Sequence, residues 1–113
     1  MIVEERIYTI QVGKVFELFK IYEQHGMAAQ KRILGNLVGY YVTEMGPLNT
    51  LVHMWAYEDL NDRDRRRAQL AADPDFKEYL GKAGPLILRQ ENRILKPAPF
   101  FEAQLKAMLA ASK

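Results

Sequence analysis

Hydrophobic and polar residues alternate along four stretches of the chain, and this period of two is typical of β-strands. The first stretch runs from Val3 to Gln11, where Tyr8 and β-branched residues are mixed with charged ones. The other three are Leu37 to Glu44, Thr50 to Tyr57 and Arg89 to Lys96. The second and third are joined by a short turn at Gly46-Pro47, so we expect them to form an antiparallel hairpin.

Three further stretches place apolar residues three and four positions apart, as on one face of a helix. The first extends from Lys14 to about Leu34 and stops at Gly35-Asn36. The second opens with Asp59 as N-cap and continues through Ala72; it restarts at Asp73-Pro74 and ends at Gly84-Pro85. The last follows Pro97-Ala98-Pro99 and carries Phe101, Leu105, Met108 and Leu109 on its apolar stripe.

The order strand, helix, strand, strand, helix, strand predicts an α+β fold of the ferredoxin-like type, βαββαβ. Two helices would cover one face of a four-stranded antiparallel sheet and leave the other face bare. We expect one domain over residues 1–113, with a core at 2–97 and a C-terminal helical extension at 100–111.

Alternation places Asn49, Leu51, His53, Trp55 and Tyr57 on one face of the third strand and Val52 and Met54 on the other. We predict that the bare face carries the aromatic set, because Val3, Ile7, Val52 and Met54 suit the helix side. Glu4, Arg6, Tyr8 and either Tyr40 or Tyr41 would join that set. A second copy meeting this face sheet to sheet would cover the aromatic patch, so we expect a homodimer. A slip of one residue in register would reverse the assignment.

Composition narrows the class of protein. Hydrophobic residues make up 49% and charged residues 27%, a balance typical of a folded, water-soluble protein. The absence of cysteine excludes disulfides, thiolate metal sites and a Cys nucleophile. The N-terminus has neither the basic region of a signal peptide nor a long apolar run, so we expect a cytoplasmic protein without membrane insertion.

The net charge of +2 gives only weak attraction to nucleic acid. Arginines at positions 63, 65, 66 and 67 form a basic run, but Asp59, Asp62 and Asp64 are interleaved with it. We therefore predict a solvated helix face there, and no nucleic-acid partner.

The chain resembles the NIPSNAP family of dimeric α/β-barrel proteins. The resemblance rests on Glu4-x-Arg6-x-Tyr8, Gly46-Pro47-Leu48-Asn49, His53-Met54-Trp55-x-Tyr57, Arg63, Arg67 and Ile94-Leu95-Lys96-Pro97-x-Pro99-Phe100. It implies a ferredoxin-like protomer whose sheets pair into a barrel, and no established reaction. Eukaryotic members are associated with mitochondria and vesicle handling. The wider superfamily includes cofactor-independent monooxygenases and haem-degrading enzymes; Asn49, Trp55 and His53 match the latter in residue type and not in position.

Two histidines are the catalytic candidates. His53 could serve as acid, base or axial ligand, or be a hydrogen-bonded cavity or interface residue. His25, late on the first helix, could close one end of the barrel cavity or bond local carbonyls. Neither has a second histidine at a metal-ligand spacing, so we expect no metal site.

The ligand-binding candidates are polar and aromatic. Trp55, Tyr8 and Tyr57 could stack on a flat organic ligand or simply fill a dimer core. Arg6 could bind a carboxylate or be neutralised by Glu4, and Asn49 could orient a polar group.

These residues predict a homodimer that binds a small organic ligand in its barrel cavity. A monooxygenase or haem-degrading enzyme and a non-catalytic interaction module remain alternatives, and whether the chain is an enzyme is left open. We expect no cofactor, and haem is retained only on the strength of the resemblance.

Overall fold

The computed structural model describes all 113 residues. Four strands form one antiparallel sheet in the order β2-β3-β1-β4. The strands are β1 (Ile2–Ile10), β2 (Asn36–Val42), β3 (Thr50–Tyr57) and β4 (Ile87–Leu95). The α+β fold and the antiparallel sheet predicted from the sequence are confirmed; the bounds of β3 are as predicted, and the ends of the other strands differ by one or two residues.

The helical segments also follow the predicted order. They are α1 (Val15–Ile21), the π-helical turn η1 (Tyr22–Gly26), α2 (Met27–Leu34), α3 (Leu60–Ala72), α4 (Pro74–Ala83), the 3-10 turn η2 (Gly84–Leu86) and α5 (Glu102–Ala111). Asp59 and Asp73 are N-caps as expected, because their carboxylates accept hydrogen bonds from the backbone N–H groups of Asp62 and Phe76. None of the helices has both the length and the apolar composition needed to cross a membrane.

The predicted helix at 14–34 contains a π-helical turn at its centre. Gly26 in this turn lies against the ring of Tyr79, and the Tyr22 hydroxyl donates to Gln30 Oε1 at 2.5 Å. The turn therefore lets α4 approach the first helix closely.

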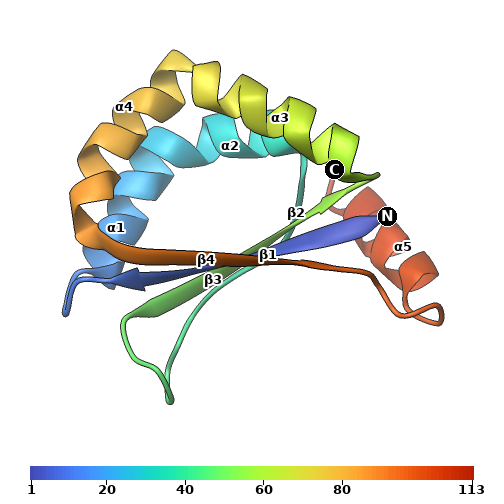
Figure 1. Ribbon diagram of the computed structural model, residues 1–113, viewed down its shortest axis with the longest axis horizontal. Coiled ribbons are helices and arrows are strands. Elements are labelled where there is room, and N and C mark those ends of the chain that lie inside the picture. The colour runs from blue at the N-terminus through green and yellow to red at the C-terminus, as the bar shows by residue number, and fades with distance from the viewer.

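The sheet separates two helical layers of unequal size (Figure 1). The helices α1 to α4 arch over one face, and the main core lies beneath them. On the opposite face α5 covers only the end of the sheet near the N-terminus, where Leu105 and Leu109 pack on Val3 and Ala56.

The predicted assignment of the sheet faces is wrong. His53, Trp55 and Tyr57 are at most 1% exposed, and Trp55 and Tyr57 pack in the core with Leu18 and Tyr79 of the helices. The aromatic set of β3 thus faces α1 to α4, and Val52 and Met54 face the other way. The second face also carries buried apolar residues, because α5 packs on it. The alternation alone therefore could not show which face the helices α1 to α4 cover.

The register of the sheet shows that the face assignment is also reversed for the other strands. Glu4, Arg6 and Tyr8 pair with Trp55, His53 and Leu51, and so also lie beneath the helices. Tyr40 of β2 joins them opposite His53, whereas Tyr41 lies on the other face and is 58% exposed. The aromatic patch is covered within one chain, and it no longer supports the predicted dimer.

Candidate functional site

His53 is held in one tautomer by its neighbour on the same strand face. The Trp55 indole Nε1–H donates to His53 Nδ1 at 2.7 Å, so Nδ1 carries no proton. The neutral ring therefore has its proton on Nε2, and this buried nitrogen has no hydrogen-bond partner. Tyr40 stacks on the imidazole with ring centroids 4.7 Å apart, and Tyr8 meets it edge-on at 5.0 Å.

The surroundings of His53 keep it uncharged. Burial, and then the positive charges of Arg6 and Arg67, lower the pKa of His53 to about 3. A histidine with this pKa is a weak base at neutral pH. In this site it offers a hydrogen-bond donor at Nε2.

Glu4 is a fully buried carboxylate that joins three elements. Its Oε2 atom accepts hydrogen bonds from Arg6 Nη1 at 3.1 Å, Arg63 Nη2 at 2.8 Å and Asn92 Nδ2 at 2.7 Å. Burial alone would raise the pKa of Glu4, but the bonds from Arg63 and Asn92 and the charges of Arg6 and Arg63 outweigh it and lower the pKa to about 2. Arg6 also donates from Nε to the Tyr8 hydroxyl at 2.9 Å.

Arg67 enters the same space from α3. It lies one turn after Arg63, which binds Glu4, and three residues before Leu70, which is in the core. Burial and the nearby charge of Arg6 lower the pKa of Arg67. It forms no ion pair and no side-chain hydrogen bond within the chain, unlike Arg63, Arg65 and Arg66.

The predicted solvated face of this arginine run is wrong for Arg63 and Arg67. The spacing of positions 63, 67 and 70 is that of one helix face, and Leu70 marks that face as the inner one. This signal was available in the sequence.

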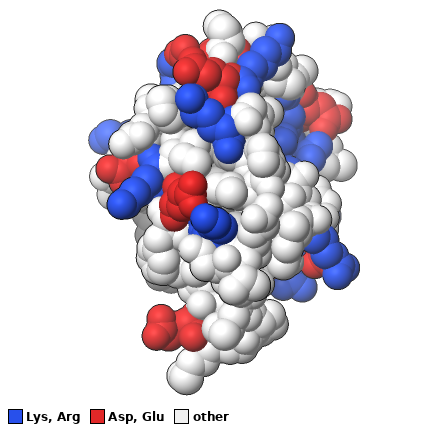
Figure 2. Space-filling view, turned by 90° about the vertical axis from the view of Figure 1, so that its left-hand side faces the viewer, with Lys and Arg blue, Asp and Glu red and all other residues white.

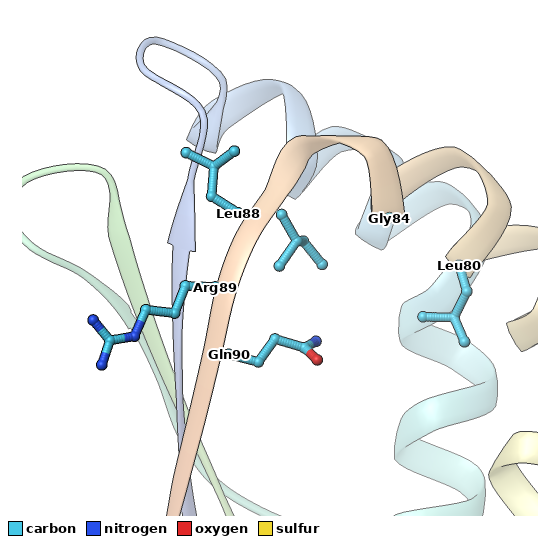
Figure 3. A pocket seen from close by; sticks show the side chains of 6 residues that line it. Leu80, Gly84, Leu88, Arg89 and Gln90 are labelled. Atoms are coloured by element: carbon cyan, nitrogen blue, oxygen red, sulfur yellow. The ribbon is translucent and has the colours of Figure 1, made fainter.

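Two hollows flank the polar cluster. One of about 270 Å³ is lined by Phe19, Tyr22, Glu23, Met27, Leu37 and Tyr40, and its Tyr40 is the ring that stacks on His53. The other, of about 320 Å³, lies between α4 and β4 and is lined by Leu80, Gly84, Ile87, Leu88, Arg89 and Gln90 (Figure 3). Gln90 points toward the helices and is the register partner of Tyr8.

The second hollow lies at an exposed edge of the sheet. Most of β4 is exposed, including Asn92 beside Arg6. Leu80 and Leu88 are also exposed, and large uncharged areas separate small groups of charged side chains at this end of the molecule (Figure 2). Asn92 is thus an exposed residue of β4 that binds Glu4 of the polar cluster.

Two candidates lie elsewhere. Asn49 is not on the strand face of His53 but in the turn before β3, with φ 59°; its backbone oxygen accepts from Ile10 N–H and its Oδ1 from Gly13 N–H. His25 lies in η1 and lines a hollow within the helical layer, beside Asp75 and Glu78. The structure brings together Arg6, Tyr8, His53, Trp55 and Tyr57 and adds Glu4, Arg63, Arg67, Tyr40 and Asn92.

The model of the NIPSNAP family matches residues 3–102. The chain is 33% identical over 94 residues to a NipSnap homolog of Dictyostelium discoideum, which covers 83% of this chain and 41% of that protein. It is 31% identical over 99 residues to human NipSnap homolog 3A, covering 86% of this chain and 39% of that protein. The chain thus spans about two fifths of the length of these relatives.

Solved structures give the same result. A NIPSNAP family protein from Agrobacterium tumefaciens superposes with a TM-score of 0.85 at 48% identity, over 88% of this chain and 94% of that one. An uncharacterized NIPSNAP-like domain protein from Burkholderia xenovorans has the same TM-score at 49% identity, over 88% and 86%. An antibiotic biosynthesis monooxygenase shares the fold, with a TM-score of 0.62 at 13% identity over 88% of this chain and all of that one. The chain belongs to the NIPSNAP family.

Proposed function

We propose that this chain is a homodimeric protein in which each protomer binds a small organic molecule between its sheet and the helices α1 to α4. The observation that carries the proposal is the buried Nε2 of His53, a donor without a partner among aromatic rings. A buried donor left unpaired costs roughly 1–3 kcal/mol, and a ligand acceptor would remove that cost.

The lining suits a flat molecule. Tyr8, Tyr40 and Trp55 surround His53 and provide ring faces and edges for stacking. The flanking hollows of about 270 and 320 Å³ lie just below and just above the lower limit of the usual range for ligand pockets, which favours one or two rings. These features support a ligand site within each protomer, whereas the sequence predicts one in the barrel cavity.

Haem does not fit at His53. The imidazole is 1% exposed, with Tyr40 stacked on its face and Trp55 bonded to its Nδ1. A porphyrin on Nε2 would have to displace the surrounding rings. The low pKa of His53 also disfavours the general-base role that an oxygenase mechanism would require of it.

The dimer would form through the sheet face opposite the helices. Beyond the end covered by α5, this face exposes Tyr41 and carries Ile7 and Val52, which pair with each other across β1 and β3. Glu5 and Arg93 form an ion pair at 2.6 Å on the same face. A second copy would bury the exposed tyrosine in a sheet-to-sheet contact.

Native mass spectrometry of the purified protein, compared with its denatured mass, tests both parts of the proposal. The expected result is a dimer that retains extra mass. That mass should be lost in His53→Ala but kept in His25→Ala, since His25 lies outside the site. A monomer would contradict the dimer, and a bare dimer that also binds no added aromatic probe would favour an interaction module.

A further inference from the structure

The charges beneath the helices are not balanced. Arg6 and Arg63 both bind the same oxygen of Glu4, and Arg63 also reaches Asp64 at the surface. These pairs account for two of the three inward-facing arginines. Arg67 has no carboxylate of its own and still lies close enough to Arg6 to feel its charge.

The other free polar groups nearby are mostly donors. His53 Nε2–H and the Tyr57 hydroxyl are buried without partners. The Tyr8 hydroxyl accepts from Arg6 Nε, so its own proton remains available. Arg63 Nε is a further unpaired donor, and the unpaired buried acceptors are Glu4 Oε1 and, beside Tyr57 in another hollow, Asn36 Oδ1.

A guanidinium without a counter-ion beside a donor-rich, aromatic site matches one class of ligand. We propose that the ligand of this site is an aromatic carboxylate, with its carboxylate on Arg67 and its ring in the hollow between α4 and β4, where Gln90 lies beside Tyr8. This inference rests on the proposed function and specifies the chemistry of the same site. Arginine is suited to the role because its planar fork matches the two oxygens of a carboxylate.

The place of Arg67 in the fold supports this role. It comes from α3, while Arg6, Tyr8 and His53 come from the sheet below, so a bound carboxylate would bridge the two layers. Entry from the exposed β4 edge would bring the anion past Asn92 and Gln90, which are uncharged. Glu4 would not repel it strongly, because two arginines already neutralise that carboxylate.

The test uses benzoate and its neutral isostere benzamide as probes of the full-length protein. Trp55 is the sole tryptophan, so its indole N–H gives a single NMR signal, and that group is bonded to His53. Benzoate is expected to shift this signal at millimolar concentration, and benzamide to bind at least about 10-fold more weakly, the usual difference for a charge-assisted contact. Arg67→Gln should remove the preference, and Arg67→Lys should restore part of it.

The matched control is Arg65→Gln on the same helix, since Arg65 is exposed and binds Asp62. It should leave the preference for benzoate unchanged. Equal binding of the two probes would overturn the inference and leave small-molecule binding standing. Unchanged preference in a folded Arg67→Gln variant would also overturn it, because another group would then bind the carboxylate. If neither probe binds, the inference fails, and the proposed function depends on the mass-spectrometry result alone.

Discussion

At the scale of single residues, His53 is a neutral imidazole kept from ionising by its surroundings. Its pKa of about 3 lies below the ordinary value of 6.5. Between these two pH values His53 is protonated in the unfolded chain and neutral in the folded chain. The contribution of His53 to the free energy of unfolding therefore does not change with pH above 6.5. Below pH 6.5 the free energy of unfolding falls by up to about 1.4 kcal/mol per pH unit.

The first prediction concerns the protonation state of this ring. Nitrogen NMR of the folded protein should show His53 with Nε2 protonated and Nδ1 bare, unchanged between pH 8 and about pH 4. In Trp55→Phe the bond to Nδ1 is lost, and the two tautomers should become mixed. A His53 that is doubly protonated at pH 6 would contradict the geometry described above.

The second prediction concerns Glu4, whose pKa of about 2 is below its ordinary 4.5. The carboxylate stabilises the fold above pH 4.5, and this contribution is lost as the pH falls toward 2. Glu4→Gln should lower the free energy of unfolding by about 3 kcal/mol at pH 7, because Arg6 and Arg63 lose their counter-ion.

Urea unfolding of wild type and Glu4→Gln from pH 7 to pH 3 measures this effect. The gap between the two proteins should narrow below pH 4.5, where the wild-type carboxylate loses its advantage. Glu44→Gln is the control, because Glu44 is exposed and forms no ion pair. A gap that stays constant with pH would show that packing, and not charge, sets the cost of the substitution.

At the scale of elements, local sequence signals are enough to place most helices and strands. The Asp59 and Asp73 caps and the turn at Gly46-Pro47 depend on side-chain and backbone chemistry within a few residues, so they could be read directly. The π-helical turn could not, because Gly26 in this turn packs on Tyr79, a residue far away in the chain. The inward direction of Arg67 could have been inferred from Leu70.

The third prediction tests the π-helical turn with two glycines. A Cβ at Gly26 would lie 2.6 Å from Cγ of the buried Tyr79 ring, whereas one at Gly81 in α4 meets nothing within 4 Å. Gly26→Ala should therefore destabilise the protein by about 1–3 kcal/mol. Gly81→Ala should be neutral or stabilise it by up to about 1 kcal/mol.

Thermal and urea unfolding of the two alanine variants measure this difference in stability. The substitution is the same in both and the helical propensity favours alanine in both, so the difference isolates the contact with Tyr79. Equal stability of the two variants would mean that α4 can move away from η1 at no cost. The π-helical turn would then not be needed for their close packing.

At the scale of the whole molecule, the sheet face that the helices cover determines which residues meet in the candidate site. The alternation in β3 correctly grouped His53, Trp55 and Tyr57 but could not assign them to the helix side. Because α5 packs on Val3 and Ala56, the second face also carries apolar residues, and the sequence alone does not show which face the larger helical layer covers. The candidate residues could thus be listed from the sequence, whereas their convergence with Arg63 and Arg67 needed the fold.

The same reversal changes which residues should hold a dimer together. With the His53 face covered by helices, the face left for a second copy centres on Tyr41, with Ile7 and Val52 beside it. Substituting a residue of this face should affect assembly and leave the site beneath the helices intact. Substituting an exposed aromatic residue of the helical layer should affect neither.

The fourth prediction is that Tyr41→Glu converts the proposed dimer to a monomer. The tyrosine is 58% exposed in one chain, so a charge is tolerated in the folded monomer but would be buried without a partner in a sheet-to-sheet contact. Phe16→Glu is the control, because Phe16 is 70% exposed on α1. Sedimentation velocity should show a monomer for the first variant and a dimer for the second, with unchanged circular dichroism. If Tyr41→Glu remains dimeric while Phe16→Glu dissociates, the copies meet through the helical layer, and the open sheet face must have another partner.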